Sequence, residues 1–265
     1  MQWYEKVAVL GRVASRRPYD LLSIIHDRQK GRYLRRTLPE QGSIHGDFSR
    51  VSIDAPNRTD LEQFEEIWVG QAYGLLDAFV PKSGWTVVDI GANIGCYTLW
   101  AARHSRRGKI YAFEPVPETF GYLQRNIEAN KLGYSEVDIK LYSYAIADTD
   151  DTLSMLITAE STGWNRLISG DDLKRETRRV IQVPVKPLDA LIPDESVDCL
   201  KVDVEGAELL VFQGASRTLQ NSERVIMEYH SAELFTKCKT LLEKYGLELA
   251  LRTSQPNLGM AYFQR

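Results

Sequence analysis

Cysteine is scarce in this chain of 265 residues, and long apolar runs are missing. The three cysteines, Cys96, Cys199 and Cys238, lie far apart and form no C-x-x-C pair. An odd number of unpaired cysteines argues against a disulfide framework and against a structural zinc site, and favours reduced thiols in the cytoplasm. No apolar run approaches the roughly 20 residues of a membrane-spanning helix, and the N-terminal stretch lacks the apolar core of a signal peptide. We therefore expect a cytoplasmic protein.

Internal repeats and low-complexity linkers are also absent, and 43% hydrophobic with 26% charged residues is an ordinary globular composition. Charge is nevertheless uneven. Residues 1–36 contain nine Lys and Arg against three Asp and Glu, although the whole chain has a net charge of −3. Such a segment forms a solvated helical face or approaches phosphate, anionic glycans or a membrane surface. Peripheral contact with a membrane or a lipid-linked substrate is one hypothesis for this N-terminus.

The sequence pattern changes near residue 80. Residues 1–36 resemble helices, and residues 37–60 resemble loops with a hairpin around 51–53. A helix or helix pair is expected from Leu61 to about Val80, with Asp60 as its N-cap and Gln63 completing a capping box. We predict an N-terminal helical extension over 1–80 that caps the substrate site, followed by one domain over 81–265.

Strands and helices alternate in this second part. We expect strands at 86–90, 109–113, 138–146, 152–158, 180–185, 197–204, 224–229, 247–252 and 260–263. We expect helices at 95–104, 117–131, 207–219 and 232–245. Such alternation predicts a mostly parallel sheet in an α/β fold, with helices on both faces. The short connection between the last two strands makes them an antiparallel pair.

A glycine motif, Asp89-Ile90-Gly91-Ala92-Asn93-Ile94-Gly95, joins the first of these strands to a helix. Its spacing is G-x-x-x-G, whereas a dinucleotide site prefers G-x-G-x-x-G to seat a pyrophosphate on the helix N-terminus. Asp89 would repel a pyrophosphate but suits an ammonium group. S-adenosylmethionine carries both an amino group and a sulfonium. We therefore predict a loop for that cofactor, formed by Asp89, Gly91, Ala92, Asn93 and Gly95; a purely structural turn is the alternative.

Two further segments follow the next strands. Glu114 and Pro115 end the second strand about 20 residues past the glycines, where an acid accepts hydrogen bonds from ribose hydroxyls. Ala145 and Asp148 lie at the end of the third expected strand. We predict that Asp148 or the backbone beside it frames an adenine ring, although Asp148 also suits a turn.

The segment Leu200-Lys201-Val202-Asp203-Val204-Glu205 combines charges with an apolar strand. Alternation places Lys201, Asp203 and Glu205 on one side of that strand. Buried charges are costly unless they are paired or functional. We predict catalytic roles for all three; for Lys201 the alternative is a buried ion pair, with Asp89 as a candidate partner.

The next strand ends in Met227-Glu228-Tyr229-His230. A histidine at the carboxyl end of a strand is a candidate general base. Together with Asp203, Glu205 and Glu228, His230 is also a candidate ligand of Mg²⁺, which would bind a sugar diol and lower its pKa. A purely structural His230 is the alternative.

Together these motifs resemble the FkbM family of S-adenosylmethionine-dependent methyltransferases. The resemblance rests on VVDIGANIGCYTL, FEP, LKVDVEGAELLVFQGA and MEYH, in that order, and covers about residues 70–265. It implies the class I methyltransferase fold, a Rossmann-like sheet of seven strands with the last antiparallel. It also implies O-methylation of a sugar, a glycan or a polyketide-type small molecule.

The resemblance further assigns roles to particular segments. The 89–95 loop would hold the methionine part of the cofactor, Glu114 the ribose, and the segment around 145–148 the adenine. Asp203 would lie near the transferring methyl group, and Gln71 and Tyr73 would close over the cofactor. Residues 1–60 match no family pattern.

Two other functions compete with this interpretation. Lys201 with its neighbouring acids, the basic N-terminus and the Arg175–Arg179 cluster fit an RNA ribose 2′-O-methyltransferase, although the negative net charge makes a nucleic-acid partner the weaker hypothesis. A scaffold that kept the fold without catalysis is disfavoured by the retained acids. The sequence leaves open the oligomeric state, with a dimer as one option, and the identity of the acceptor.

Overall fold

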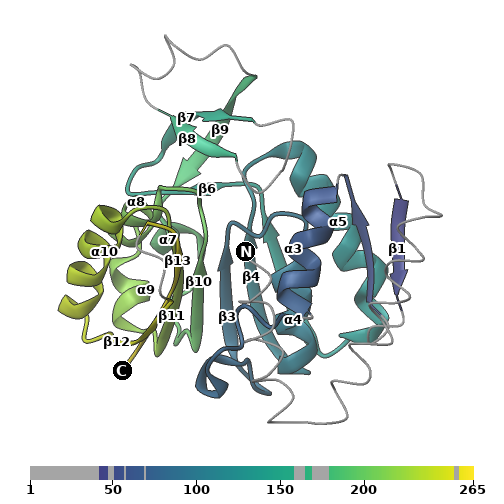
Figure 1. The fold of residues 1–265 in the computed structure, drawn as a ribbon, viewed down its shortest axis with the longest axis horizontal. Helices are drawn as coiled ribbons and strands as arrows, with labels where there is room; N and C mark the ends of the chain where they lie inside the picture. Colours follow the sequence, from purple (N-terminus) through teal and green to yellow (C-terminus); the bar gives the residue numbers. More distant parts are fainter. Residues whose placement is uncertain are drawn as a thin grey trace.

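The computed structural model describes residues 42–46, 51–56, 58–68, 70–157, 165–168, 179–253 and 257–265. These residues form a large sheet flanked by helices, with a smaller sheet beyond one end of it (Figure 1). The helices expected over 1–36 lie outside the described residues.

The large sheet confirms the predicted architecture. In spatial order its strands are β12 (Glu248–Arg252), β13 (Gly259–Gln264), β11 (Arg224–Tyr229), β10 (Cys199–Val202), β3 (Thr86–Ile90), β4 (Gly108–Phe113) and β5 (Val137–Tyr142). Strands β11, β10, β3, β4 and β5 are parallel to one another, and β13 is antiparallel to both of its neighbours. This is the expected seven-stranded sheet with the last strand reversed.

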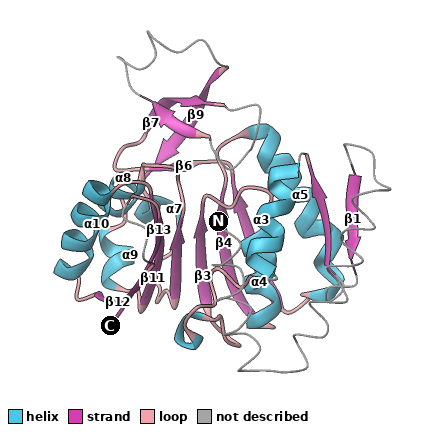
Figure 2. Ribbon diagram, in the orientation of Figure 1, coloured by secondary structure: helices cyan, strands magenta, loops and turns pink. Residues whose placement is uncertain are grey.

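Helices cover both faces of the sheet, because neighbouring apolar residues point to opposite sides of each strand. Val88 of β3 belongs to a core formed with α8, α9 and α10, and Val87 belongs to a second core formed with α3 and α4. Figure 2 shows these two helical layers. The helices are α3 (Arg58–Trp68), α4 (Cys96–Ser105), α5 (Pro117–Asn130), α7 (Leu188–Leu191), α8 (Glu208–Gln213), α9 (Ser216–Gln220) and α10 (Ala232–Lys244), with short 3-10 turns at Asp77–Phe79 and Lys131–Gly133.

A second, four-stranded sheet has the order β6-β9-β7-β8. Its strands are β6 (Ala145–Ile146), β7 (Asp151–Leu156), β8 (Arg166–Ile168) and β9 (Val180–Lys186). The 152–158 and 180–185 segments, both expected as strands, pair with each other in the antiparallel β7–β9 ladder. This small sheet lies above the large one in Figure 1.

The segment before residue 80 contains the predicted hairpin, formed by β1 (Gly42–Gly46) and β2 (Val51–Ala55). The helix prediction is partly wrong. Helix α3 begins at Arg58 and ends at Trp68, so Asp60 lies in its first turn and is no N-cap. An acid in the first turn is stabilised by the helix dipole, as an acid at the cap would be. Val51 and Phe64 share one core with α4.

Two boundaries in the second part also differ from prediction. The expected strand over 138–146 ends at Tyr142, because its partner β4 ends opposite at Phe113, and Ala145 begins the small sheet. The expected helix over 207–219 is interrupted at Gly214, where a Cβ atom would lie 2.0 Å from the carbonyl oxygen of Ala147. The close approach of these two backbones divides the helix into α8 and α9.

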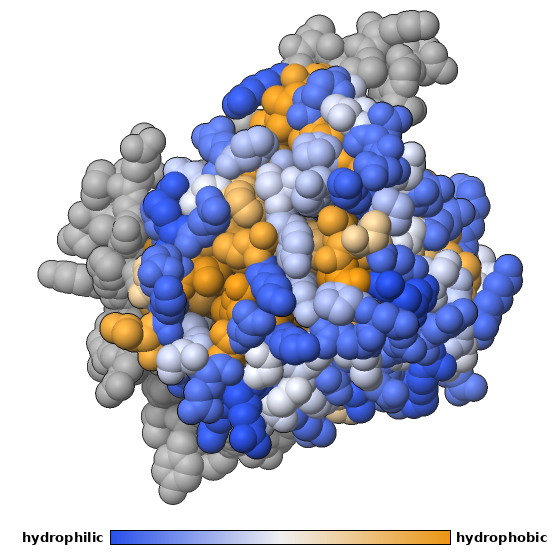
Figure 3. Space-filling model, turned by 180° about the vertical axis from the view of Figure 1, so that it is seen from behind, coloured by the Kyte–Doolittle hydropathy of each residue, from blue (hydrophilic) through white to orange (hydrophobic). Residues whose placement is uncertain are grey.

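The surface of the described part mixes polar and apolar side chains. On the face opposite to that of Figure 1, apolar side chains gather near the middle and polar ones surround them (Figure 3). Among the residues that the structure describes, no helix is both long enough and apolar enough to cross a bilayer.

Candidate active site

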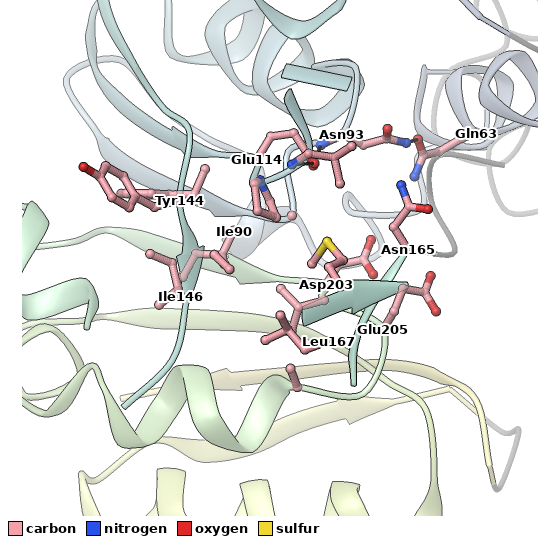
Figure 4. A pocket seen from close by; sticks show the side chains of 18 residues that line it. Gln63, Ile90, Asn93, Glu114, Tyr144, Ile146, Asn165, Leu167, Asp203 and Glu205 are labelled. Carbon is pink, nitrogen blue, oxygen red and sulfur yellow. Dashed lines mark hydrogen bonds between the residues drawn. The ribbon is translucent and has the colours of Figure 1, made fainter. Parts of the chain in front are cut away.

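One pocket lies at the carboxyl ends of β3, β4 and β10, beneath the small sheet. It is lined by Gln63, Ile90, Gly91, Asn93, Phe113, Glu114, Pro115, Val116, Tyr144, Ala145, Ile146, Met155, Asn165, Leu167, Asp203, Val204, Glu205 and Ala207. Figure 4 shows Gln63, Asn165 and Glu205 on one side and the apolar Tyr144 and Ile146 on the other. The pocket thus has a polar end and an apolar end.

The glycine loop forms the floor of the pocket, with a backbone that few residues tolerate. Gly91 has a φ of 77°, and a Cβ atom there would lie 1.8 Å from the carbonyl oxygen of Asp203. Asn93 stands where a dinucleotide motif has its central glycine, and its φ of 49° is left-handed. Asparagine adopts this conformation more readily than most residues. Its side chain donates a hydrogen bond to Gln63 of α3 at 2.8 Å.

Glu114 supplies a buried carboxylate at the end of β4. Its oxygens accept hydrogen bonds from the backbone N–H groups of Asn93 at 3.1 Å and Val116 at 2.9 Å. Burial is the main cause that raises the pKa of Glu114 to about 7, against these hydrogen bonds, which lower it. Backbone contacts fix the carboxylate beside the glycine loop, where it can accept hydrogen bonds from a ribose.

Asp89 and Lys201 form a buried ion pair behind the loop. The Asp89 Oδ1 and Lys201 Nζ atoms are 3.1 Å apart, and Thr98 donates to Asp89 Oδ2 at 2.6 Å. Lys201 also donates to the carbonyl oxygen of Gly91 at 2.7 Å. Lys201 therefore forms the buried ion pair with Asp89 that was expected as the alternative to a catalytic role. Neither residue lines the pocket, and Asp89 supports the loop from behind; its direct contact with an ammonium group stays a prediction.

Asp203 lines the pocket directly after β10. Its Oδ2 accepts a hydrogen bond from the hydroxyl of Tyr73 at 3.2 Å and lies 3.7 Å from the Lys201 ammonium. Tyr73 is buried and does not line the pocket; it reaches it through Asp203, and its closing over the cofactor stays a prediction. The Asp203 carboxylate is held from two sides and faces the polar end of the pocket.

His230 lies between two carboxylates. Its Nε2 is 3.1 Å from Glu205 Oε2, and its Nδ1 is 2.8 Å from Glu208 Oε1. Burial lowers the pKa of His230, but the two glutamates outweigh it and raise the pKa to about 11. An imidazole that keeps its proton at neutral pH is a poor general base. This arrangement disfavours the predicted role of His230 as the general base. The strand pattern carries no information about the two glutamates that surround its ring.

Glu205 reaches this cluster through a turn. The strand ends at Val202, and Glu205 has a φ of 54°, so its position does not follow from alternation along the strand. Burial raises the pKa of Glu205, and the hydrogen bond with His230 lowers it. Glu208, the first residue of α8, is fully buried and also accepts from the N–H of Gly206 at 3.0 Å.

The donor set fits the expected Mg²⁺ site poorly. Of the four expected ligands, Asp203, Glu205 and His230 have mutually close ligand atoms among the described residues, and Glu228 does not join them. Both ring nitrogens of His230 already face carboxylates, and Mg²⁺ prefers oxygen ligands. Burial, with the charge of Asp203 adding to it, raises the pKa of Glu228 to about 8.

The other predicted cofactor residues divide into two groups. Pro115 and Ala145 line the pocket as expected. Ala92 is buried and Gly95 precedes α4, but neither lines the pocket. Asp148 and Gln71 are exposed and lie outside the pocket lining, because Asp148 follows β6 of the small sheet and Gln71 occupies the turn after α3. Their contact with the cofactor stays a prediction. Apolar side chains such as Ile146 bound the other end of the pocket.

Several lining residues are not marked by any sequence motif, among them Gln63, Met155 and Leu167. They come from α3, β7 and β8, elements that carry no glycine or acidic signal. Only their spatial arrangement identifies them. Gln63, interpreted from sequence as part of a capping box, instead contacts Asn93 of the cofactor loop.

Comparison with known proteins agrees with this geometry. The methyltransferase FkbM domain model matches residues 89–249. Methyltransferase 1 of Beauveria bassiana is 30% identical over 236 residues, 81% of this chain and 91% of that protein. The hexuronic acid methyltransferase AglP of Haloferax volcanii is 32% identical over 152 residues, 54% of this chain and 55% of that protein. A crystal structure of methyltransferase FkbM from Methylobacillus flagellatus superposes with a TM-score of 0.50 at 15% identity, covering 92% of this chain and 62% of that chain.

The strand order and the glycine-floored pocket at the carboxyl ends of the strands define a class I methyltransferase. The domain match extends over more than half of the chain. The chain belongs to the FkbM family of S-adenosylmethionine-dependent methyltransferases.

Proposed function

We propose that this enzyme transfers a methyl group from S-adenosylmethionine to a hydroxyl of a sugar, a glycan or a polyketide-type small molecule. The observation that carries the proposal is the polar end of the pocket. There the carboxylates of Asp203 and Glu205 lie in the same cavity as the glycine loop and Glu114. Carboxylates suit an acceptor that donates hydrogen bonds, as hydroxyl groups do.

The residues present fit the cofactor. Gly91 lets the loop pass directly against the Asp203 backbone at the edge of the pocket, and the fixed Glu114 carboxylate suits two ribose hydroxyls. The apolar wall around Ile146 suits an adenine ring. When bound, S-adenosylmethionine supplies a methyl group activated by its sulfonium charge, so the chain mainly has to align the acceptor.

In this proposal Asp203 is the general base. Its carboxylate lines the pocket and is oriented by Tyr73 and Lys201. The acceptor hydroxyl gives its proton to Asp203, and Glu205 orients the acceptor through a second hydrogen bond. General-base catalysis contributes about 10²–10⁴-fold to a rate. Asp203→Asn should therefore lower kcat by about that factor.

The acceptor class is tested with purified enzyme, labelled cofactor and a panel of neutral sugars, hexuronic acid glycosides and hydroxylated polyketides. Hexuronic acids belong in the panel because AglP, a relative of this chain, is named for them. Transfer to a hydroxyl supports the proposal. Binding of the cofactor together with transfer to nitrogen or carbon alone would contradict it.

An RNA ribose acceptor receives no support from the site. Lys201, the cue for that alternative, is buried and engaged with Asp89, Asp203 and the Gly91 carbonyl oxygen. It is therefore not available to an RNA hydroxyl. An RNA affinity that falls steeply with salt would reopen this alternative.

A further inference from the structure

The cluster formed by Glu205, His230 and Glu208 joins the acceptor end of the pocket to the interior of the protein. Glu205 lines the pocket, His230 is half-buried behind it, and Glu208 is fully buried. The two contacts of His230, at 3.1 Å and 2.8 Å, run in opposite directions from its two ring nitrogens. The cluster is therefore a row of three groups that ends at the pocket.

The number of hydrogen bonds that an imidazole can donate determines the charge of His230 in this row. A neutral imidazole has one N–H donor, and an imidazolium has two. Ionised carboxylates only accept, so both contacts of His230 are satisfied together only when the ring carries both protons. The second carboxylate oxygen of Glu208 has no hydrogen-bond partner within the described part of the chain, so its negative charge is balanced mainly through His230.

Glu205 depends on this support. Its φ of 54° and that of Gly206, 102°, show that the backbone is left-handed at two successive residues. Such a conformation costs a residue with a side chain about 1–2 kcal/mol. It persists only when the surroundings determine it, and such strain gathers at functional sites. The N–H of Gly206 is itself held by Glu208. Glu208 thus fixes both the turn and the histidine that contacts Glu205.

We propose that His230 is a positioning residue that remains an imidazolium, with Glu208 as its buried counter-ion, and that it holds the Glu205 carboxylate in place to orient the acceptor. The proposal rests on the proposed function for its acceptor, but the charge of His230 is independent of any acceptor. The charged groups around His230 in the described residues are Glu205 and Asp203 of the loop after β10, Glu208 of α8 and Glu228 of its own strand.

The charge is tested by ¹⁵N NMR of histidine-labelled enzyme without cofactor, because ring nitrogen shifts distinguish imidazolium from the neutral tautomers. The chain has four histidines, and His230→Gln assigns the signal. We expect both ring nitrogens of His230 to remain protonated from pH 6 to about 9, since its pKa is raised to about 11. In Glu208→Gln the ring should lose a proton at a lower pH. A neutral tautomer in the native enzyme at pH 7 would overturn the proposal.

The positioning role is tested by kinetics on the acceptor found for the proposed function. Loss of a charge-assisted hydrogen bond should raise the acceptor KM about tenfold or more in Glu205→Gln and in His230→Gln. The double variant should show little further loss, because both changes remove one contact. The cofactor Kd, measured by calorimetry, should stay close to its native value, as in the control His104→Gln on α4.

Two outcomes contradict this role. Additive increases of the acceptor KM in the double variant would mean that His230 and Glu205 act independently. An equal loss of cofactor affinity would mean that His230 only stabilises the fold. If no acceptor is found at all, the proposed function fails while the NMR result still decides the charge of His230. If His230→Gln does not fold, Glu208→Gln and the native spectrum carry the same test.

Discussion

The ammonium of Lys201 lies 2.7 Å from the carbonyl oxygen of Gly91 and 3.1 Å from Asp89, and its side chain is only 3% exposed. Removing one partner of a buried pair leaves an uncompensated charge and costs about 3–5 kcal/mol. Lys201→Met should therefore lower the free energy of unfolding by about that amount and weaken cofactor binding. Chemical denaturation and calorimetry measure the two effects.

A double variant separates these effects. Asp89→Asn added to Lys201→Met removes the second charge and leaves an amide oxygen that can still accept from Thr98. We expect part of the lost stability to return, while cofactor affinity stays low because the Gly91 carbonyl oxygen has still lost its donor. A double variant with native affinity would show that Lys201 does not support the loop.

The close packing of Gly91 against β10 leads to a second prediction, which concerns cofactor binding by the loop. A Cβ atom at this position would lie 1.8 Å from the Asp203 carbonyl oxygen, so Gly91→Ala must displace the loop from β10. Gly84 is a matched control, because its φ of 91° is also positive but a Cβ atom there meets nothing within 4 Å. Gly84→Ala should cost only the conformational strain of about 1–2 kcal/mol. Calorimetry should show cofactor binding lost in Gly91→Ala and kept in Gly84→Ala; equal affinities would refute the close-approach argument.

Glu114 makes cofactor affinity depend on pH. Its pKa is raised to about 7, mainly by burial, and the ionised form accepts hydrogen bonds best. As pH falls through about 7 the carboxylate gains a proton, so the affinity should decline between pH 8 and pH 6. In Glu114→Gln the affinity should be low and flat across this range, because the amide cannot ionise. A native affinity that is constant from pH 6 to pH 8 would contradict a role for this carboxylate.

The fold was predictable because its signals are periodic. Strand β3 carries an apolar run, and the turn after it carries a glycine spacing that its positive φ at Gly91 favours. The position of Glu205 was not predictable in the same way. Alternation placed it on the same side as Asp203, and the two carboxylates do lie close together, but only a left-handed turn brings Glu205 to His230 as well. Such a turn depends on Glu208 and Gly206 together, and no periodic pattern marks it.

The role of Asp89 shows a second limit of sequence reasoning. An acid before the glycines suggested contact with a charged ligand, yet its carboxylate is occupied by Lys201 and Thr98. The sequence gives residue types along one strand. Whether two neighbouring strands pair their charges with each other or with a ligand depends on register, and Lys201 lies directly opposite Asp89 in the β10–β3 ladder.

Glu228 yields a prediction about stability. Burial and the nearby Asp203 raise its pKa to about 8 in the folded chain, from about 4.5 when unfolded. Folding therefore favours the protonated form of Glu228. The stability that Glu228 contributes is fully present below about pH 4.5 and is lost as pH rises through about 8. Glu228→Gln cannot ionise and escapes that loss. Its melting temperature should exceed that of the native enzyme increasingly between pH 5 and pH 9.

In a protein of this length, each kcal/mol of unfolding free energy shifts the melting temperature by about 2–4 °C, and this relation sets the size of the expected difference. Thermal unfolding followed by circular dichroism at several pH values measures it. Glu223→Gln is the control, because Glu223 is an exposed glutamate immediately before the same strand. The difference between this control and the native enzyme should not change with pH. A constant offset for Glu228→Gln as well would mean that Glu228 ionises as freely in the folded chain as in the unfolded one, so that one more carboxylate near Asp203 is charged at neutral pH than we infer.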